Sequence, residues 1–184
     1  MIDERTGRPT DGDAGDARNT VDAGSGGYPR FPHLHGGLIC FTAEDDLWIA
    51  PLPDPGPGGT GDGDGTLATG RAWRLTVDRV RPGTPRFSPD GRHIAFTNGL
   101  SYDPEVYVAD VDGGPARRLT HWAAPDTAVQ GWDGDRVLAI GSHGQPFSWF
   151  TRAHRVPMSG GPGEELPWGP VNGICVGPTP EGAP

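Results

Sequence analysis

Short runs of alternating apolar and polar residues follow one another between positions 84 and 120. Alternation with a period of two is typical of β-strands that bury one face. The runs predict four strands, over residues 84–87, 92–97, 105–110 and 115–120. In the third run, Val106 and Val108 are expected on one face of the sheet and Tyr107 on the other.

Turn-forming residues separate these runs. In Ser88-Pro-Asp-Gly91, the proline presets φ, the aspartate can bond its own backbone, and the glycine supplies a positive φ. Asp112-Gly-Gly114 predicts a hairpin turn of the Asp-Gly type. Four short strands joined by such turns are typical of one blade of a β-propeller.

The same pattern recurs along the chain. Arg74-Leu-Thr76 returns 44 residues later as Arg118-Leu-Thr120, and Ile94-Ala-Phe96 aligns at the same spacing with Leu138-Ala-Ile140. A period near 44 residues with four strands per unit indicates tandem blades, since one blade cannot bury both its faces alone. We therefore predict an all-β fold, a partial β-propeller of about three four-stranded blades plus the start of a fourth. An open sandwich of short hairpins is the alternative.

The repeats define the organisation of the chain. Blades are expected at 28–77, 84–121 and 126–168, and the first strand of the next at 170–176. Three segments have compositions that cannot bury enough apolar surface to offset their ordering entropy. They are an acidic tail (1–27), a loop rich in Gly, Pro and Asp inside the first blade (54–66) and the end of the chain (177–184), and we expect all three to be disordered or flexible.

Charge narrows the class of partner. The formal net charge is −9, and all fifteen basic residues are arginines. Nucleic acids and anionic membranes are bound through clustered positive charge, so the sequence predicts neither as a partner. The one adjacent basic pair, Arg117-Arg118, is interpreted as a solvated strand edge.

Cysteine use and hydropathy bear on localisation. Cys40 and Cys175 lie far apart, and Cys40 falls inside an apolar run, so a disulfide framework is not predicted. The sequence shows neither a signal peptide pattern nor an apolar run of transmembrane length. We therefore expect a reducing, cytoplasmic setting.

Catalytic chemistry is not predicted for this chain. None of the serines lies in a Gly-x-Ser-x-Gly motif. A Ser-His-Asp triad is defined by geometry rather than by chain order, so the sequence leaves one open. The six serines are Ser25, Ser88, Ser101, Ser142, Ser148 and Ser159.

Two further clusters are expected to be structural. His33 and His35 alternate like strand residues, but a metal site would need a third ligand, so they are expected to flank Leu34 as a core position. Asp45 and Asp46 are interpreted as a solvated hairpin tip. No metal and no cofactor is predicted.

The loops of the propeller are the predicted functional surface, because loops at the ends of blades line the concave opening where ligands bind. Peptide or partner contacts are assigned to five loop residues, and for the tryptophans packing between blades is the alternative. The five are Tyr102, Asp103, Trp122, Trp132 and Trp149.

Two stretches carry a family resemblance. Arg86-Phe-Ser-Pro-Asp-Gly-Arg-His-Ile-Ala-Phe96 resembles the propeller repeat of TolB, tricorn protease and the dipeptidyl-peptidase class. The segment from Tyr28 to Ile49, with its Glu-Asp-Asp-Leu-Trp turn and strand, resembles the opening of the six-bladed N-terminal propeller of tricorn protease. The resemblance covers roughly residues 28–176 and implies that the chain is truncated about halfway around that propeller.

The resemblance also implies a function. Tricorn proteases are cytoplasmic serine peptidases that trim peptides, and their catalytic residues belong to C-terminal domains. This chain is therefore expected to be a fragment that gates or docks peptides for those domains and that is inactive alone. A stand-alone TolB-like binding module for a protein or peptide is the alternative. Unpaired blade edges recruit other chains, so self-association is also expected.

Overall fold

In the computed structural model, the described residues are 28–52, 71–77, 81–99 and 102–177. Their regular structure consists of three separate four-stranded antiparallel sheets. The predicted tail (1–27), the glycine-rich loop (54–66) and residues 178–184 of the predicted end lie outside this part of the chain.

The sheets follow one another in sequence, and each uses four consecutive strands. Blade 1 contains β1 (Arg30–His35), β2 (Leu38–Ala43), β3 (Asp46–Pro51) and β4 (Trp73–Arg74). Blade 2 contains β5 (Gly83–Phe87), β6 (His93–Asn98), β7 (Glu105–Asp110) and β8 (Arg117–Arg118). Blade 3 contains β9 (Ala128–Asp133), β10 (Arg136–Gly141), β11 (Arg152–Pro157) and β12 (Glu164–Glu165). The predicted all-β fold of three four-stranded blades is confirmed.

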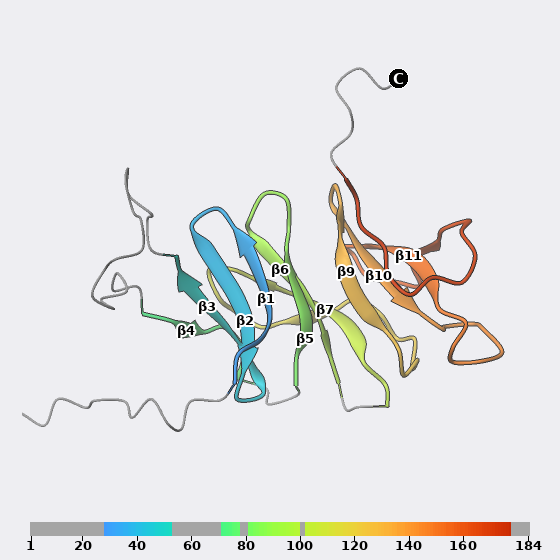
Figure 1. The fold of residues 1–184 in the computed structure, drawn as a ribbon, viewed down its shortest axis with the longest axis horizontal. Coiled ribbons are helices and arrows are strands. Elements are labelled where there is room, and N and C mark those ends of the chain that lie inside the picture. Colours follow the sequence, from blue (N-terminus) through green and yellow to red (C-terminus); the bar gives the residue numbers. More distant parts are fainter. Residues whose placement is uncertain (1–27, 53–70, 78–80, 100–101, 178–184) are drawn as a thin grey trace, which may run out of the picture.

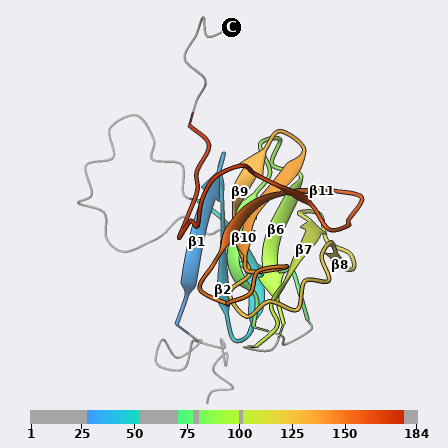
Figure 2. The same cartoon turned by 90° about the vertical axis from the view of Figure 1, so that its right-hand side faces the viewer.

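The three blades lie side by side and do not close into a ring (Figure 1). The first strands of the blades are the innermost, because β5 contacts both β1 and β9. In the view turned by 90°, β1 and β9 lie toward one side of the molecule and β8 toward the other (Figure 2). This radial order is the arrangement that defines a propeller.

The core consists of layers between blades rather than one central cluster. Strand β7 shows why, since its side chains alternate between two such layers. Val106 and Val108 pack toward blade 3 with Trp122 and Val129, whereas Tyr107 packs with the buried residues shared by blades 1 and 2. The predicted facing of β7 is thereby confirmed.

The turns follow the chemistry expected from the sequence. The Ser88 Oγ donates to the Asp90 carboxylate at 2.6 Å, and the Gly91 N–H donates to the Ser88 carbonyl at 2.9 Å. Gly91 has φ of +70°, a conformation that costs a residue with a Cβ atom about 1 kcal/mol or more. The turn therefore joins β5 to β6 at the position predicted.

One ion-pair position repeats in all three blades. It joins the first residue of the third strand to the second residue of the two-residue outer strand. The pairs are Asp46 with Arg74 at 3.0 Å, Glu105 with Arg118 at 2.8 Å, and Arg152 with Glu165 at 3.6 Å. The third blade reverses the charges, so the position conserves the ion pair and not the sign of either residue.

These pairs correct one interpretation made from the sequence and add to another. Asp46 is fully buried and accepts a hydrogen bond from the Thr76 hydroxyl at 2.9 Å, so it is not part of a solvated hairpin tip. Arg118 is exposed, as expected of a strand edge, but its guanidinium also neutralises a buried carboxylate. The sequence does not reveal that this charge is paired, because the partner carboxylate lies on another strand.

The segment expected to start a fourth blade has no strand over residues 170–176. It runs across the far face of blade 3, where Val171 and Ile174 pack on Leu138, Ala153 and Leu166. The Val171 N–H donates to the Thr151 carbonyl at 3.0 Å. The segment thus covers the face that a next blade would cover, without forming a ladder of its own.

Candidate functional site: the blade ends and the inner strands

Three of the five predicted contact residues are exposed at one end of the blades. Tyr102 and Asp103 lie between β6 and β7, and Trp149 lies between β10 and β11. The side chains of Tyr102 and Trp149 are 85% and 70% exposed. In an antiparallel blade the second connection emerges opposite the first, so these residues share one end of neighbouring blades.

The other two are buried. Trp122 lies in the layer between blades 2 and 3, where its indole N–H donates to the Pro162 carbonyl at 3.0 Å. Trp132 lies in the same layer and donates to the Arg86 carbonyl at 3.0 Å. Both residues therefore occupy the packing role that was the alternative to partner contact, although Trp132 still lines a pocket described below.

Trp149 belongs to an aromatic cluster that the sequence analysis did not single out. Its ring stacks on Phe147 with centroids 4.7 Å apart and planes 7° apart, and Phe147 lies 6.2 Å from Phe150. Phe147 and Phe150 are also exposed. The sequence carries a signal for this cluster, since three of the four residues in Phe147-Ser-Trp-Phe150 are aromatic.

A first pocket of about 280 Å³ lies over the inner strands. Its polar groups come from one blade after another: His33 and His35 from β1, Arg86 from β5 and Gln130 from β9. Arg86 donates to the Gln130 carbonyl at 3.3 Å and to the Pro85 carbonyl at 2.9 Å. We call this the inner-strand pocket.

His33 enters the inner-strand pocket as a neutral ring. Burial, followed by the positive charge of Arg86, lowers the pKa of His33 below its usual value. Its Nδ1 accepts the Phe87 N–H at 3.1 Å, so the ring proton resides on Nε2. The pocket therefore combines a permanent cation with an uncharged hydrogen-bond donor.

The two histidines also correct an expectation about Leu34. The rings of His33 and His35 lie 6.0 and 5.8 Å from the ring of Phe87 in blade 2. Leu34 alternates to the opposite face and is 57% exposed, so it is not a core position. The pattern of β1 was interpreted with the wrong face inward.

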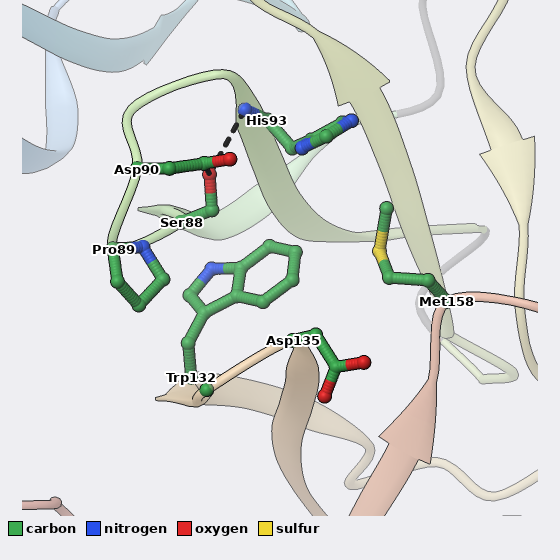
Figure 3. A pocket seen from close by; sticks show the side chains of 8 residues that line it. Ser88, Pro89, Asp90, His93, Trp132, Asp135 and Met158 are labelled. Carbon is green, nitrogen blue, oxygen red and sulfur yellow. Dashed lines mark hydrogen bonds between the residues drawn. The ribbon is translucent and has the colours of Figure 1, made fainter.

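A second pocket, of about 330 Å³, lies between blades 2 and 3 at the opposite end from Tyr102 (Figure 3). We call it the inter-blade pocket. It is formed by the first turns of these blades and by a residue from the β11–β12 turn. Its lining comprises Ser88, Pro89, Asp90, His93, Trp132, Gly134, Asp135 and Met158.

The inter-blade pocket contains a serine, an aspartate and a histidine, but they are not arranged for nucleophilic catalysis. The Ser88 hydroxyl donates to Asp90 and accepts the backbone N–H of His93 at 3.0 Å. The His93 ring instead faces Asp110, with Nε2 3.2 Å from the carboxylate. A nucleophilic serine needs a base that takes its proton, and this imidazole is turned away.

Ser142 shows a similar arrangement at the other end of blade 3. Its hydroxyl donates to Asp126 at 2.6 Å, and the neighbouring His143 ring is 3.3 Å from the Trp122 carbonyl. Ser25 and Ser101 lie outside the described residues. Within the described ranges, no group of three or more His, Cys, Asp or Glu side chains is placed to hold a metal ion.

The fold and these surfaces define an open, β-propeller-type arrangement of blades. The protein-family model of the tricorn protease N-terminal β-propeller domain matches residues 26–182 of this chain. The chain belongs to this family.

Two tricorn-type proteins are similar to this chain over about four-fifths of its length. The putative tricorn protease homolog 2 of Streptomyces coelicolor is 53% identical over 153 residues, which cover 80% of this chain and 12% of that protein. The putative tricorn-like protease N-terminal subunit of Sulfurisphaera tokodaii is 26% identical over 156 residues, and the match covers 82% of this chain and 71% of that shorter protein. The chain thus spans about an eighth of the former relative and most of the latter.

Solved structures agree with the sequence comparison. The crystal structure of the tricorn protease matches with a TM-score of 0.66 and 26% identity, over 83% of this chain and 14% of that one. A putative TolB from Agrobacterium tumefaciens matches with a TM-score of 0.52 and 22% identity, over 76% of this chain and 48% of the other. The TolB likeness shows the fold alone.

No helix in the described parts of the chain is long and apolar enough to cross a membrane.

Proposed function

We propose that this chain is a propeller part of a tricorn-like serine peptidase and that it docks or gates peptides for catalytic domains outside it. The observation that carries the proposal is membership of the N-terminal propeller family together with a match to only 12% of the length of the Streptomyces homolog. Neither serine arrangement described above suits catalysis, so we expect the chain alone to leave peptides intact.

Two surfaces suit peptide docking. The inner-strand pocket offers the Arg86 cation and the His33 N–H, which are donors for the carbonyl groups or the carboxylate of a peptide. The exposed rings of Tyr102 and Trp149 offer apolar contact area with a low entropic cost of ordering. Loops presented by a rigid sheet commonly carry binding residues.

The partner of the chain is, in this proposal, a polypeptide that carries the catalytic domains. The Sulfurisphaera relative, described as an N-terminal subunit, supports an association between separate chains. We place the complex in the cytoplasm, which agrees with the two free thiols. Cys175 is exposed, and burial raises the pKa of the Cys40 thiol to about 12, so Cys40 stays protonated and unreactive.

Self-association is a further part of the proposal. The face of blade 1 that points away from blade 2 is apolar, and we call it the blade-1 face. It consists of Leu34, Ile39, Phe41 and Trp48, which are exposed or half-buried. A propeller covers such a face with a neighbouring blade, so we propose that a second copy of the chain packs on it.

Peptide binding tests the docking function. A mixture of unstructured peptides of about ten residues is titrated into the isotopically labelled 184-residue chain, and binding is followed by NMR. We expect Trp149→Ser to weaken binding by about fivefold, because a contact aromatic contributes ~1 kcal/mol or more. Trp168, half-exposed after β12, gives the matched control Trp168→Ser, which is expected to have no effect.

Peptide docking and the expected lack of hydrolysis are tested by separate results. An absence of binding at millimolar peptide, or equal weakening by the two serine variants, would remove the docking role. Hydrolysis of a fluorogenic peptide by the purified chain would show instead that catalytic groups are present within it.

A further inference from the structure

The inter-blade pocket has an apolar floor that is held in place. Trp132, Pro89 and Met158 provide it, and the hydrogen bond from the Trp132 indole to Arg86 fixes the orientation of the ring. In Figure 3 the indole lies between Asp90 on one side and Asp135 on the other. A side chain entering the pocket would therefore lie along an aromatic ring with a carboxylate at each side.

Asp90 is oriented by the turn that it belongs to. Its Oδ1 accepts the Ser88 hydroxyl at 2.6 Å and the Arg92 N–H at 3.1 Å, while its second oxygen has no hydrogen-bond partner among the described residues. The hydrogen bond from Ser88, followed by that from Arg92, holds the pKa of Asp90 below its usual value. The carboxylate is therefore ionised at neutral pH and keeps one oxygen for a ligand.

Asp135 is exposed and, in the described part of the chain, makes neither a hydrogen bond nor an ion pair. The lining contains no arginine, and the ring of His93 is directed to Asp110. Asp90 and Asp135 thus line one apolar pocket whose lining contains no arginine. The Arg117 guanidinium is near, since it donates to the carbonyl of the lining residue Met158. The net charge of −9 adds to the attraction for a positive ligand.

We propose that the inter-blade pocket binds a long basic side chain, arginine or lysine, of a peptide or protein segment. The aliphatic stem of that side chain packs on Met158 and Trp132, as long basic side chains do on apolar surface. Its charged group reaches Asp90 and Asp135 and lies near the indole, which also attracts cations. The pocket volume of about 330 Å³ admits one such side chain.

The inference is independent of the docking function proposed above. The pocket lies at the opposite end of the blades from Tyr102 and Trp149. It shares the lining residues Ser88, Pro89 and Trp132 with the inner-strand pocket, but His33, Arg86 and Gln130 do not line it. Its ligand is defined by charge and shape, whereas the docking surfaces are defined by peptide carbonyl groups and aromatic contacts.

The test uses three small probes: the N-acetyl amides of arginine, lysine and the neutral isostere citrulline. Each is titrated into the ¹⁵N-labelled 184-residue chain, and the indole N–H resonance of Trp132 is followed after assignment with Trp132→Phe. We expect saturable shifts with the arginine and lysine probes at millimolar concentration, and none with citrulline. Added salt is expected to weaken the shifts because the carboxylates are at the surface.

Asp135→Asn removes one carboxylate and keeps its shape. It is expected to weaken binding of the arginine probe by about fivefold, in line with one partly exposed ion pair. Asp112→Asn is the matched control, since Asp112 is an exposed turn residue outside the pocket and the net charge changes equally. The control is expected to bind like the unmodified chain.

Three results would overturn the inference. They are an unchanged Trp132 resonance with both basic probes, equal shifts with citrulline, and equal weakening by the Asp135 and Asp112 variants. A shift with arginine alone or with lysine alone supports the inference and narrows the ligand to that residue.

Discussion

The Glu105 carboxylate and the Arg118 guanidinium, thirteen positions apart in the chain, lie 2.8 Å from each other. Glu105 is almost fully buried, and it also accepts hydrogen bonds from the Thr120 hydroxyl at 2.5 Å and from the Trp122 and Ala123 backbone N–H groups at 2.9 Å. One side chain thereby ties β7 to the outer strand and to the linker that leads into blade 3.

Replacing Glu105 by glutamine should destabilise the chain. The amide removes the ion pair and presents an NH₂ group to donors that need an acceptor, so a loss of about 3 kcal/mol is expected. The matched control is Glu164→Gln, because the Arg136–Glu164 pair at 3.0 Å is exposed and should contribute less than ~1 kcal/mol. Urea unfolding of the two variants measures both values, and equal losses would contradict the role given to Glu105.

Glu105 also makes the free energy of unfolding depend on pH in the acid range. Burial raises the pKa of Glu105, but the hydrogen bonds from Thr120, Ala123, Trp122 and Arg118 outweigh it and hold that pKa below its usual value. Its stabilising contribution is therefore full above the unfolded pKa and is lost as the pH falls through the folded one. The slope of unfolding free energy against pH below about 4.5 should decrease in Glu105→Gln.

His154 should make stability fall between pH 7 and 5. Its ring is buried 4.6 Å from that of Trp122, and neither ring nitrogen has a hydrogen-bond partner within the described structure. Burial lowers the pKa of His154, so the unfolded chain takes up the proton first and stability is lost as the pH falls below 6.5. One such group contributes a slope of at most about 1.4 kcal/mol per pH unit.

His154→Phe tests this without breaking a hydrogen bond. The urea midpoint of the variant should depend less on pH. Between pH 7 and pH 5.5, the variant should lose less stability than the unmodified chain. His33, whose pKa is also lowered, remains as a second source of slope. An unchanged pH dependence would mean that the pKa of His154 is the same in the folded and the unfolded chain.

Alanine at Gly91 should cost more than alanine at Gly134. Both glycines have positive φ, +70° and +59°, in the first turns of blades 2 and 3. A Cβ at Gly91 would lie 2.5 Å from the His35 ring of blade 1, whereas none of the described atoms lies within 4 Å at Gly134. We expect losses of about 2 and about 1 kcal/mol respectively, measured by urea unfolding. Equal losses would show that the His35 ring moves aside freely.

Self-association should depend on the blade-1 face. We expect a discrete dimer in sedimentation velocity or light scattering, and we expect Leu34→Asp to weaken it because a charge would be buried without a partner. Val77→Asp serves as the control, since Val77 is exposed at 73% and is not part of that face. A monodisperse monomer of the unmodified chain would remove self-association from the proposal.

The local elements were largely predictable. The range 105–110 was predicted for β7 and is observed without change, and the Ser88–Gly91 turn forms as its residues require. The inner strand β1 was predicted with the wrong face inward, because His33 and His35 are as compatible with an interface as Leu34 is with a core. Only the neighbouring Phe87 decides between the two faces.

The candidate surfaces were less predictable. Tyr102 and Trp149 were placed correctly in loops, but Trp122 and Trp132 looked the same in sequence and are buried. The inter-blade pocket could not be anticipated, since Asp90, Asp135 and Met158 come from three separate turns. Residues far apart in the chain meet there only because blades 2 and 3 pack against each other.

The sequence by itself determined the repeat, the number of strands in each blade and the chemistry of the turns, because these depend on alternation and on the φ preferences of Pro, Gly and Asp. The tertiary structure alone decided which polar residues are buried in pairs, which aromatic rings are exposed and where the pockets lie. Those features depend on contacts between strands and between blades, and such contacts leave no period in the chain.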